Sequence, residues 1–84
     1  MKIVYTKHAI KKFKDLKALK VIVRKSHIKQ AIEKPKSVDD VTDFPKKIAS
    51  IDFGPSLILR VVYREENGKI IIITFYPGKK GRYV

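Results

Sequence analysis

The segment LILRVVYREENGKIIIITFY (57–76) constrains the fold of this chain more than any other stretch. It consists of two runs rich in β-branched and aromatic residues, separated by Glu-Asn-Gly at 66–68. Asn-Gly tolerates the positive φ angles of a tight turn, so the segment predicts a β-hairpin. The second run, Lys69–Tyr76, is apolar on both faces and is therefore expected to form a central strand that is buried on both sides.

The first strand of this hairpin, predicted over Leu57–Glu65, has two different faces. Alternation places Leu57, Leu59, Val61 and Tyr63 on one face and Ile58, Arg60, Val62 and Arg64 on the other. A charge among apolar neighbours is unfavourable unless the guanidinium reaches water or an anion. Arg60, in the middle of the strand, is therefore a candidate phosphate-binding residue. Arg64 is a second candidate, and the alternative is that both arginines only reach solvent or pair with a surface carboxylate such as Asp52 or Glu65.

The first half of the chain has helical periodicity. Lys2–Tyr5 is a short β-prone run, and Thr6 can N-cap the helix predicted over about 7–20. The apolar side of that helix is expected to contain Ala9, Phe13, Leu16 and Leu19, and the opposite side Lys7, Lys11 and Lys14. Residues 21–23 predict a bend, and a second helix is expected over about 24–34, ended by Pro35.

The remaining residues predict a loop and one further strand. The acidic, turn-rich stretch 36–45 is expected to be a loop, Lys46–Phe53 a strand and Gly54–Ser56 a turn. The resulting order is β-α-α-β-β-β. It predicts a single α+β domain over residues 1–84, with two helices packed on a small antiparallel sheet and the first strand beside the last.

The charge is strongly positive and unevenly distributed. Lys and Arg number 20 against 8 Asp and Glu, which gives a net charge of +12. Residues 1–36 contain 12 basic and 2 acidic residues, residues 69–84 contain 4 and none, and the middle is slightly acidic. The 16 lysines and 12 isoleucines are typical of a heat-adapted or AT-rich genome. A thermophilic bias normally raises Glu together with Lys, but only 3 Glu occur, so bias alone leaves the charge imbalance unexplained. A nucleic-acid partner is the first interpretation of this pattern.

Several classes of site are not expected. The chain has no Cys, no HExxH motif and no Gly-rich phosphate loop, so neither a metal site nor a small-molecule cofactor is predicted. No apolar run is long enough to span a membrane and the charged N-terminus does not resemble a signal peptide, so a cytoplasmic protein is expected. Of the two histidines, His8 is expected to be partly buried and His27 exposed.

The C-terminus is a dense group of cations with one phenol. A turn is expected at Pro77-Gly78, and Lys79, Lys80, Arg82 and Tyr83 follow it. One interpretation is a frayed cationic tail. The other is that the tail folds back over the sheet beside Arg60, so that the cations and the phenol form one anion-binding surface.

Three segments together resemble the RelE/ParE superfamily of small toxins, with the BrnT-like branch and its uncharacterised relatives as the closest likeness. They are KHAIKKF, IKQAIEKP and LRVVYREENGKIIIITFYPGKKGRY, which lie in this order along almost the whole chain. The resemblance implies a compact α+β toxin that a cognate antitoxin neutralises. RelE-like members are mRNA interferases, which inhibit translation by cleaving mRNA on the ribosome without a metal, the RNA 2′-hydroxyl attacking the adjacent phosphate.

The resemblance also implies roles for individual residues. Arg60 matches the phosphate-stabilising arginine, and Arg82 and Tyr83 match the C-terminal basic residue and tyrosine, so these three are the expected catalytic residues. RNA contacts are expected from Lys46, Lys47, Arg64, Lys79, Lys80, Lys7, Lys11 and Lys14, and His8 matches a helix-one histidine. No carboxylate or histidine is obviously placed as a general base. Three functions stay open: a metal-independent endoribonuclease, a ParE-like topoisomerase inhibitor, and an inactive relative that only binds nucleic acid or a protein.

Overall fold

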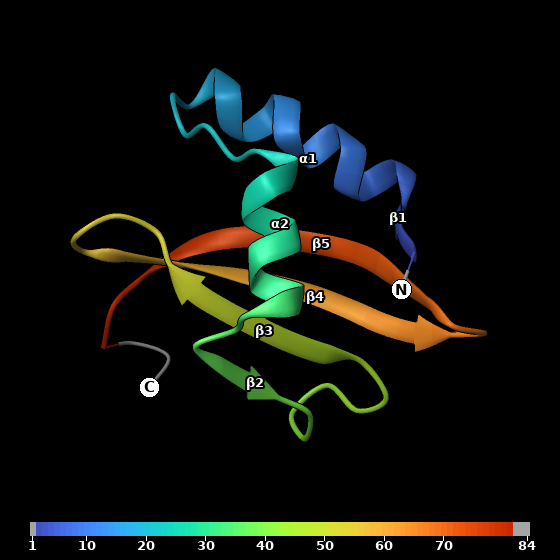
Figure 1. Ribbon diagram of the computed structural model, residues 1–84. Helices are drawn as coiled ribbons and strands as arrows, with labels where there is room; N and C mark the ends of the chain where they lie inside the picture. Colours follow the sequence, from blue (N-terminus) through green and yellow to red (C-terminus); the bar gives the residue numbers. More distant parts are fainter. Residues whose placement is uncertain (1, 82–84) are drawn as a thin grey trace.

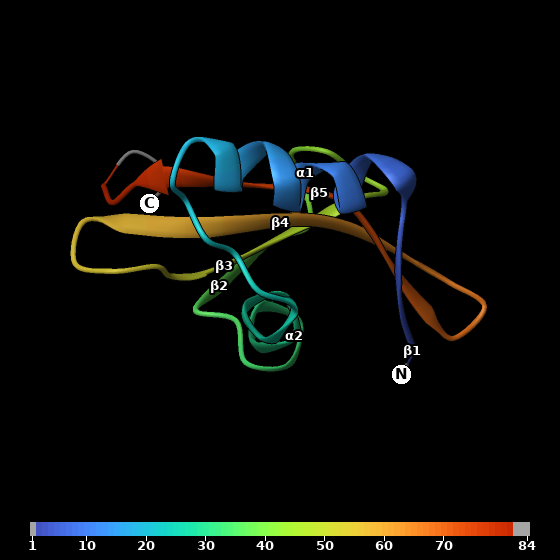
Figure 2. The ribbon, with the colours of Figure 1, turned by 90° about the horizontal axis from the view of Figure 1, so that it is seen from above.

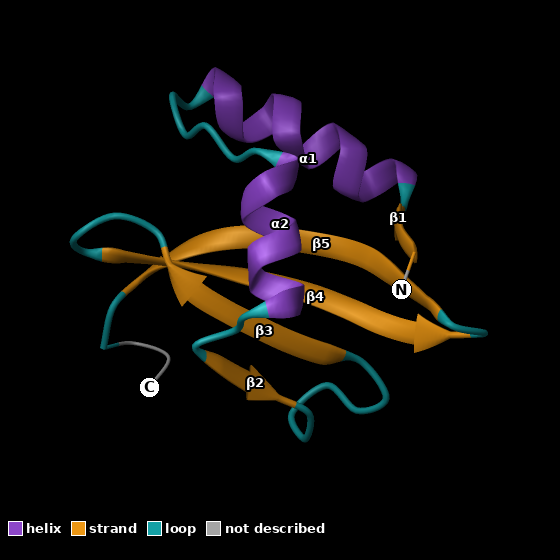
Figure 3. Ribbon diagram, viewed as in Figure 1, coloured by secondary structure: helices purple, strands orange, loops and turns teal. Residues whose placement is uncertain are grey.

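A computed structural model describes residues 2–81 of the chain (Figure 1). In chain order its elements are β1 (Lys2–Tyr5), α1 (Lys7–Ala18), α2 (Lys25–Glu33), β2 (Ser37–Asp39), β3 (Lys47–Asp52), β4 (Leu57–Glu66) and β5 (Lys69–Lys79). The predicted α+β class is confirmed, with two helices and one five-stranded sheet (Figure 3). Across the described residues, neither helix is long and apolar enough to cross a membrane.

The strands lie in the order β1-β5-β4-β3-β2. The first strand is next to the last one, as predicted, but it runs parallel to it, so the sheet is mixed and not purely antiparallel. The stretch 36–45 is not entirely a loop, because Ser37–Asp39 pairs with β3 as an additional edge strand. This strand is only three residues long and ends at the acidic Asp39, so the sequence contains no alternation long enough to predict it.

The start of α1 is attached to the sheet through one threonine. The Thr6 Oγ1 accepts a hydrogen bond from the Ala9 N–H at 3.1 Å, as expected of an N-cap, and donates one to the Ile73 carbonyl of β5 at 3.0 Å. The Thr6 N–H donates to the Ile72 carbonyl at 3.1 Å. A single side chain therefore caps the helix and also attaches it to β5.

Replacing Thr6 with alanine is expected to destabilise the fold by about 1–2 kcal/mol, because the Ala9 N–H and the Ile73 carbonyl both lose a partner. Thr6→Ser keeps the hydroxyl and should lose only a fraction of that. Urea denaturation of both variants measures the difference. Equal losses of unfolding free energy in the two variants would show that the Thr6 hydroxyl does not stabilise the fold.

The hydrophobic core lies between the helices and one face of the sheet. In Figure 1, α2 crosses in front of β3 and β4, while α1 runs along the β1–β5 side. The cluster of buried residues contains Ala9, Leu16, Val23, Ile28, Ala31, Ala49, Ile51, Leu59, Val61, Tyr63, Ile70, Ile72 and Phe75. The prediction of Leu19 as a core residue is wrong. The helix ends before it, and its side chain is 73% exposed.

A β-bulge in the β4–β5 hairpin decides which residues of β5 face the core. Tyr63 pairs with Ile72 whereas Val62 pairs with Thr74, so Ile73 is an additional residue in β5. Beyond the bulge, Phe75 lies opposite Val61 in the core, and Tyr76 lies opposite Arg60 on the other face. The bulge thus determines which aromatic side chain accompanies the arginine.

The turn predicted at Pro77-Gly78 is absent, because both residues continue β5. Pro77 pairs with Leu59 and Gly78 with Ile58, and the strand ends only at Lys79. A proline is tolerated there because β1 pairs only with residues 69–72 of β5, so the outer edge of β5 has no described strand beside Pro77. The chain turns afterwards, at Gly81, whose φ of +87° suits glycine.

Candidate nucleic-acid interface

The face of the sheet opposite the core, here called the open face, has a row of polar side chains at its centre. Register pairs Ser37 with Ser50, Ser50 with Arg60, and Arg60 with Tyr76, so these four side chains lie side by side across β2, β3, β4 and β5. Directly paired residues share a face of a sheet, and we call this set the polar row. The neighbouring row is more apolar and includes the buried Ile48 and Val62. Figure 2 shows the loop that follows β2 on this side of the sheet, away from α2.

Arg60 and Tyr76 form the centre of the polar row. The Arg60 Nε donates a hydrogen bond to the Tyr76 hydroxyl at 3.1 Å, and the guanidinium carbon lies 5.9 Å from the centre of the Tyr76 ring. Both residues are half-buried and both belong to the longest strands of the sheet. The aromatic ring therefore holds a cation in place on a rigid support, an arrangement suited to binding a phosphate.

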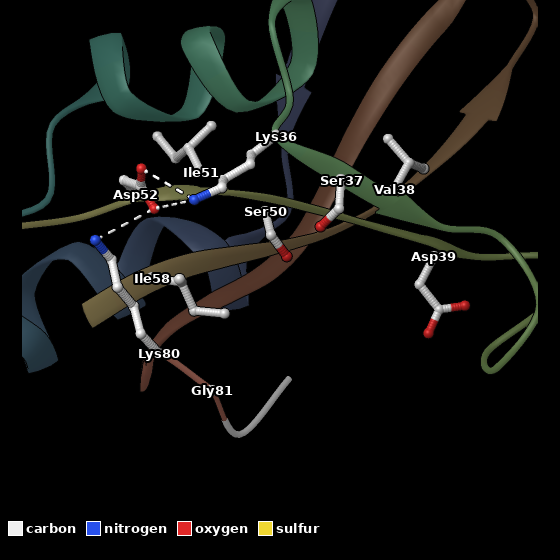
Figure 4. Close-up of a pocket in the computed structure, with 10 residues that line it drawn as sticks. All are labelled: Lys36, Ser37, Val38, Asp39, Ser50, Ile51, Asp52, Ile58, Lys80 and Gly81. Carbon is white, nitrogen blue, oxygen red and sulfur yellow. Dashed lines mark hydrogen bonds and ion pairs between the residues drawn. The ribbon is translucent and has the colours of Figure 1, made fainter. Parts of the chain in front are cut away.

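A second group of charges lies beside the polar row, where β2 begins and β5 ends. The Lys36 Nζ is 3.1 Å and 3.3 Å from the two carboxylate oxygens of Asp52, and the Lys80 Nζ is 3.5 Å from Asp52 Oδ1 (Figure 4). We call these three residues the lysine–aspartate cluster. Hydrogen bonding from Lys36, and to a smaller extent the charge of Lys80, holds the pKa of the Asp52 carboxyl below its ordinary value. The cluster combines two positive charges with one negative charge.

An open pocket of about 510 Å³ lies between this cluster and the polar row. Lys36 and Lys80 are at its border, the Ile58 side chain gives it an apolar wall, and the hydroxyls of Ser37 and Ser50 line it, whereas the Val38 side chain points to the other side of β2 (Figure 4). Ser50 is buried although it lies on the open face, and it is the only buried polar residue among residues 2–81. The pocket is thus bordered by cations and adjoins Arg60 through Ser50.

Asp39 lies at the other end of β2 and has a strongly perturbed carboxyl group. The hydroxyl of Thr42, followed by the backbone N–H groups of Thr42 and Val41, donates to the carboxylate and lowers the Asp39 pKa to about 2. The positive charge of Arg60 lowers it by a smaller amount. The carboxylate therefore organises the beginning of the β2–β3 loop.

This pKa leads to a pH-dependent prediction. Because the native pKa lies below the ordinary value of 3.8, the stability contributed by Asp39 is complete above pH 3.8 and is lost as the pH falls toward 2. Thr42→Ala removes the largest cause and should raise the Asp39 pKa toward its ordinary value, whereas Thr42→Ser should leave it near 2. NMR titration of the Asp39 carboxyl carbon measures both, and an unchanged titration in Thr42→Ala would contradict the assignment.

Several residues predicted to bind RNA lie away from the polar row. Lys47 pairs with Tyr63 on the core-facing side, and its Nζ contacts Glu65 Oε1 at 3.2 Å, which raises the Lys47 pKa. Lys79 pairs with Leu57, on the side of β5 opposite to Lys80. Lys46 is exposed just before β3, and the α1 side chains Lys7, Lys11 and Lys14 are exposed on a helix that packs against β1 and β5.

The other predicted residues have mixed outcomes. The Arg64 Nε contacts Glu66 at 3.1 Å, not Asp52 or Glu65. His8 is exposed, not partly buried, because its neighbour Ala9 occupies the position that faces the core. His27 is half-buried, not exposed, because its Nδ1 accepts the Arg24 N–H at 2.9 Å and its ring packs edge-on against Phe53. Arg82 and Tyr83 lie outside the described residues.

Several residues of the interface were not predicted from the sequence as part of it. They include Ser37, Ser50, Tyr76, Lys36, and Asp52 as a bridge between two lysines. Tyr76 could not be paired with Arg60 without knowing the position of the bulge. Nothing in the sequence distinguishes Lys36 and Asp52 from other surface residues, and they meet only because β2 pairs with β3. Among residues 2–81, no group of three metal-ligating side chains is present.

No family model matches the chain, and neither a curated protein nor a solved structure is significantly similar to it. The assignment to the RelE/ParE superfamily stays a prediction.

Proposed function

We propose that this protein is the toxin of a toxin–antitoxin pair and cleaves ribosome-bound mRNA without a metal, through the open face of its sheet. The observation that carries the proposal is the position of Arg60, at the centre of the polar row and bonded to the Tyr76 hydroxyl. The net charge of +12 supports an RNA substrate. The order of the motifs shared with the RelE-like toxins supports the reaction type.

In the proposed reaction, the RNA 2′-hydroxyl attacks the adjacent phosphorus and the 5′-oxygen of the next nucleotide leaves. The products are a 2′,3′-cyclic phosphate and a 5′-hydroxyl. Arg60 would stabilise the charge that develops on the phosphate, and the rigid strand would keep the guanidinium in place. Tyr76 orients Arg60 and offers a ring on which a base could stack. The ribosome would supply the alignment of the mRNA.

The proposed antitoxin would bind the same basic surface with acidic and apolar residues. Two large apolar side chains in the β2–β3 loop, Val41 and Phe44, are 78% and 80% exposed, which supports a protein contact on this side of the sheet. The antitoxin would then cover the RNA-binding face and exclude the mRNA.

The proposal is tested with purified protein and a translating mRNA in the presence of EDTA. Cleavage within ribosome-bound message, with 2′,3′-cyclic phosphate ends, is the expected result. RNA binding without cleavage would refute the nuclease and leave a nucleic-acid-binding protein. Growth arrest on expression without any cleavage of mRNA would favour the ParE-like alternative.

A further inference from the structure

The pocket beside the polar row has no role in the cleavage step described above, yet two residues that line it, Ser50 and Ile58, are neighbours of Arg60. Ile58 lies two residues before Arg60 on the same face of β4, so the two side chains are about 7 Å apart along the strand. Ile58 pairs with Asp52 of the lysine–aspartate cluster. A step of this size is comparable to the spacing between successive phosphates in an extended RNA strand. An RNA strand bound at Arg60 would therefore reach the pocket with its next nucleotide.

The border of the pocket is suited to a phosphate. Lys36 precedes β2 and Lys80 follows β5, and their ammonium groups converge on the same carboxylate oxygen, at 3.1 Å and 3.5 Å (Figure 4). The side chains of Lys36, Asp52 and Lys80 are 65%, 50% and 38% exposed, so these ion pairs are screened and contribute little to stability. A phosphate could replace Asp52 as the partner of both lysines at little energetic cost.

The interior of the pocket is suited to a base. Its volume of about 510 Å³ falls within the range of about 300–1,000 Å³ typical of small-molecule sites. Ile58 provides apolar surface for the flat side of a base, and the hydroxyls of Ser37 and Ser50 can both donate and accept hydrogen bonds. The pocket therefore offers one nucleotide both an apolar wall and polar contacts.

We propose that this pocket is a nucleotide subsite for single-stranded RNA, in which Lys36 and Lys80 hold a phosphate and Asp52 acts as an internal counterion that weakens binding. This inference rests on the proposed function, since it extends the RNA path from Arg60. Its specific consequence is that the lysines and the aspartate have opposite effects on RNA affinity. A purely structural role for the cluster would make all three substitutions act in the same direction.

The test measures the affinity of the full-length protein for a short, unstructured, fluorescein-labelled single-stranded RNA by fluorescence anisotropy. The double variant Lys36→Ala/Lys80→Ala is expected to bind about tenfold more weakly at low salt. The dependence of log Kd on log salt concentration is measured between about 50 and 200 mM salt. The slope for this variant should be smaller by about 0.7, which corresponds to the loss of one neutralised phosphate on a single strand. Asp52→Asn is expected to bind a few-fold more tightly than the wild type.

The matched control is Lys17→Ala/Lys29→Ala, which removes the same charge from exposed positions on α1 and α2. It should change affinity and salt slope much less than the pocket variant. Equal effects of the two double variants, or weaker binding by Asp52→Asn, would overturn the subsite. Thermal unfolding by circular dichroism confirms that each variant is folded.

These results separate the subsite from the proposed function. If the wild type binds RNA but does not cleave it, the nuclease proposal is refuted while the binding data still test the subsite. If the wild type cleaves mRNA and the pocket variant binds as the wild type does, the subsite is refuted and the nuclease stands. A wild type that does not bind the free RNA refutes the subsite, whereas the nuclease is still tested by cleavage of ribosome-bound mRNA.

Discussion

Replacing Arg60 with alanine is expected to reduce cleavage of ribosome-bound mRNA by about 100-fold or more. Removing one group that stabilises charge in a transition state typically costs about 10²–10³ in rate. Arg60 is at the centre of the open face and its guanidinium is oriented by the Tyr76 hydroxyl at 3.1 Å. The rate is measured by single-turnover primer extension on stalled ribosomal complexes. Tyr76→Phe, which removes the hydroxyl and keeps the ring, should show a smaller loss.

Arg64 is the matched control for Arg60. It lies on the same face of β4 by alternation, about 13 Å farther along the strand, and it is paired with Glu66. Arg64→Ala removes an identical charge and should reduce cleavage only slightly. Loss of the Arg60 charge should also raise the Asp39 pKa slightly. Measuring this rise in Arg60→Ala shows that the variant is folded and lacks only the guanidinium. A full rate of cleavage by folded Arg60→Ala would remove the basis for the proposed mechanism.

Replacing Phe75 with alanine is expected to have the largest effect on stability, a loss of about 3–5 kcal/mol. The Phe75 side chain is fully buried, and its ring lies 4.6 Å from that of Phe13 on α1. Folded proteins have only about 0.05–0.15 kcal/mol of stability per residue, so this loss would be a large part of the total. A decrease in Tm of at least about 12 °C is expected for a domain of this size, measured by circular dichroism.

The control for this prediction is Phe44, an aromatic residue of the same type that is 80% exposed in the β2–β3 loop. Phe44→Ala should change the Tm by little, because it leaves no cavity. A small loss in Phe75→Ala, comparable to that in Phe44→Ala, would contradict the assigned position of Phe75 in the core.

Much of the fold could be predicted from local patterns. The helical spacing of Ala9, Phe13 and Leu16 and the capping residue Thr6 gave the position of α1 to within two residues. The Asn-Gly turn gave the β4–β5 hairpin, and alternation along β4 placed Arg60 on the face opposite Leu59. These features depend on contacts between residues close in sequence, or on a period that belongs to one element.

Features that depend on neighbours distant in sequence were missed. β2 exists because β3 is available to pair with it, and Pro77 can stay in a strand because β1 ends before reaching it. The lysine–aspartate cluster joins residues 36, 52 and 80, which no local pattern relates to one another. The predicted RNA-binding residues Lys47 and Lys79 lie on the core-facing side, because charge in the sequence does not specify a face.

The bulge at Ile73 is the clearest example of a feature that local sequence did not predict and tertiary packing decided. If the register of the Glu66–Lys69 pair continued along the hairpin without a bulge, Phe75 would pair with Arg60. A shift of one residue moves every side chain of a strand to the other face of the sheet. The sequence of β5 is apolar or aromatic at every position from Ile70 to Tyr76 except Thr74, so its pattern cannot choose between the two registers. Local sequence thus specified the hairpin and the arginine. Packing of Phe75 against α1 decided the register, and with it that Tyr76 and not Phe75 lies beside Arg60.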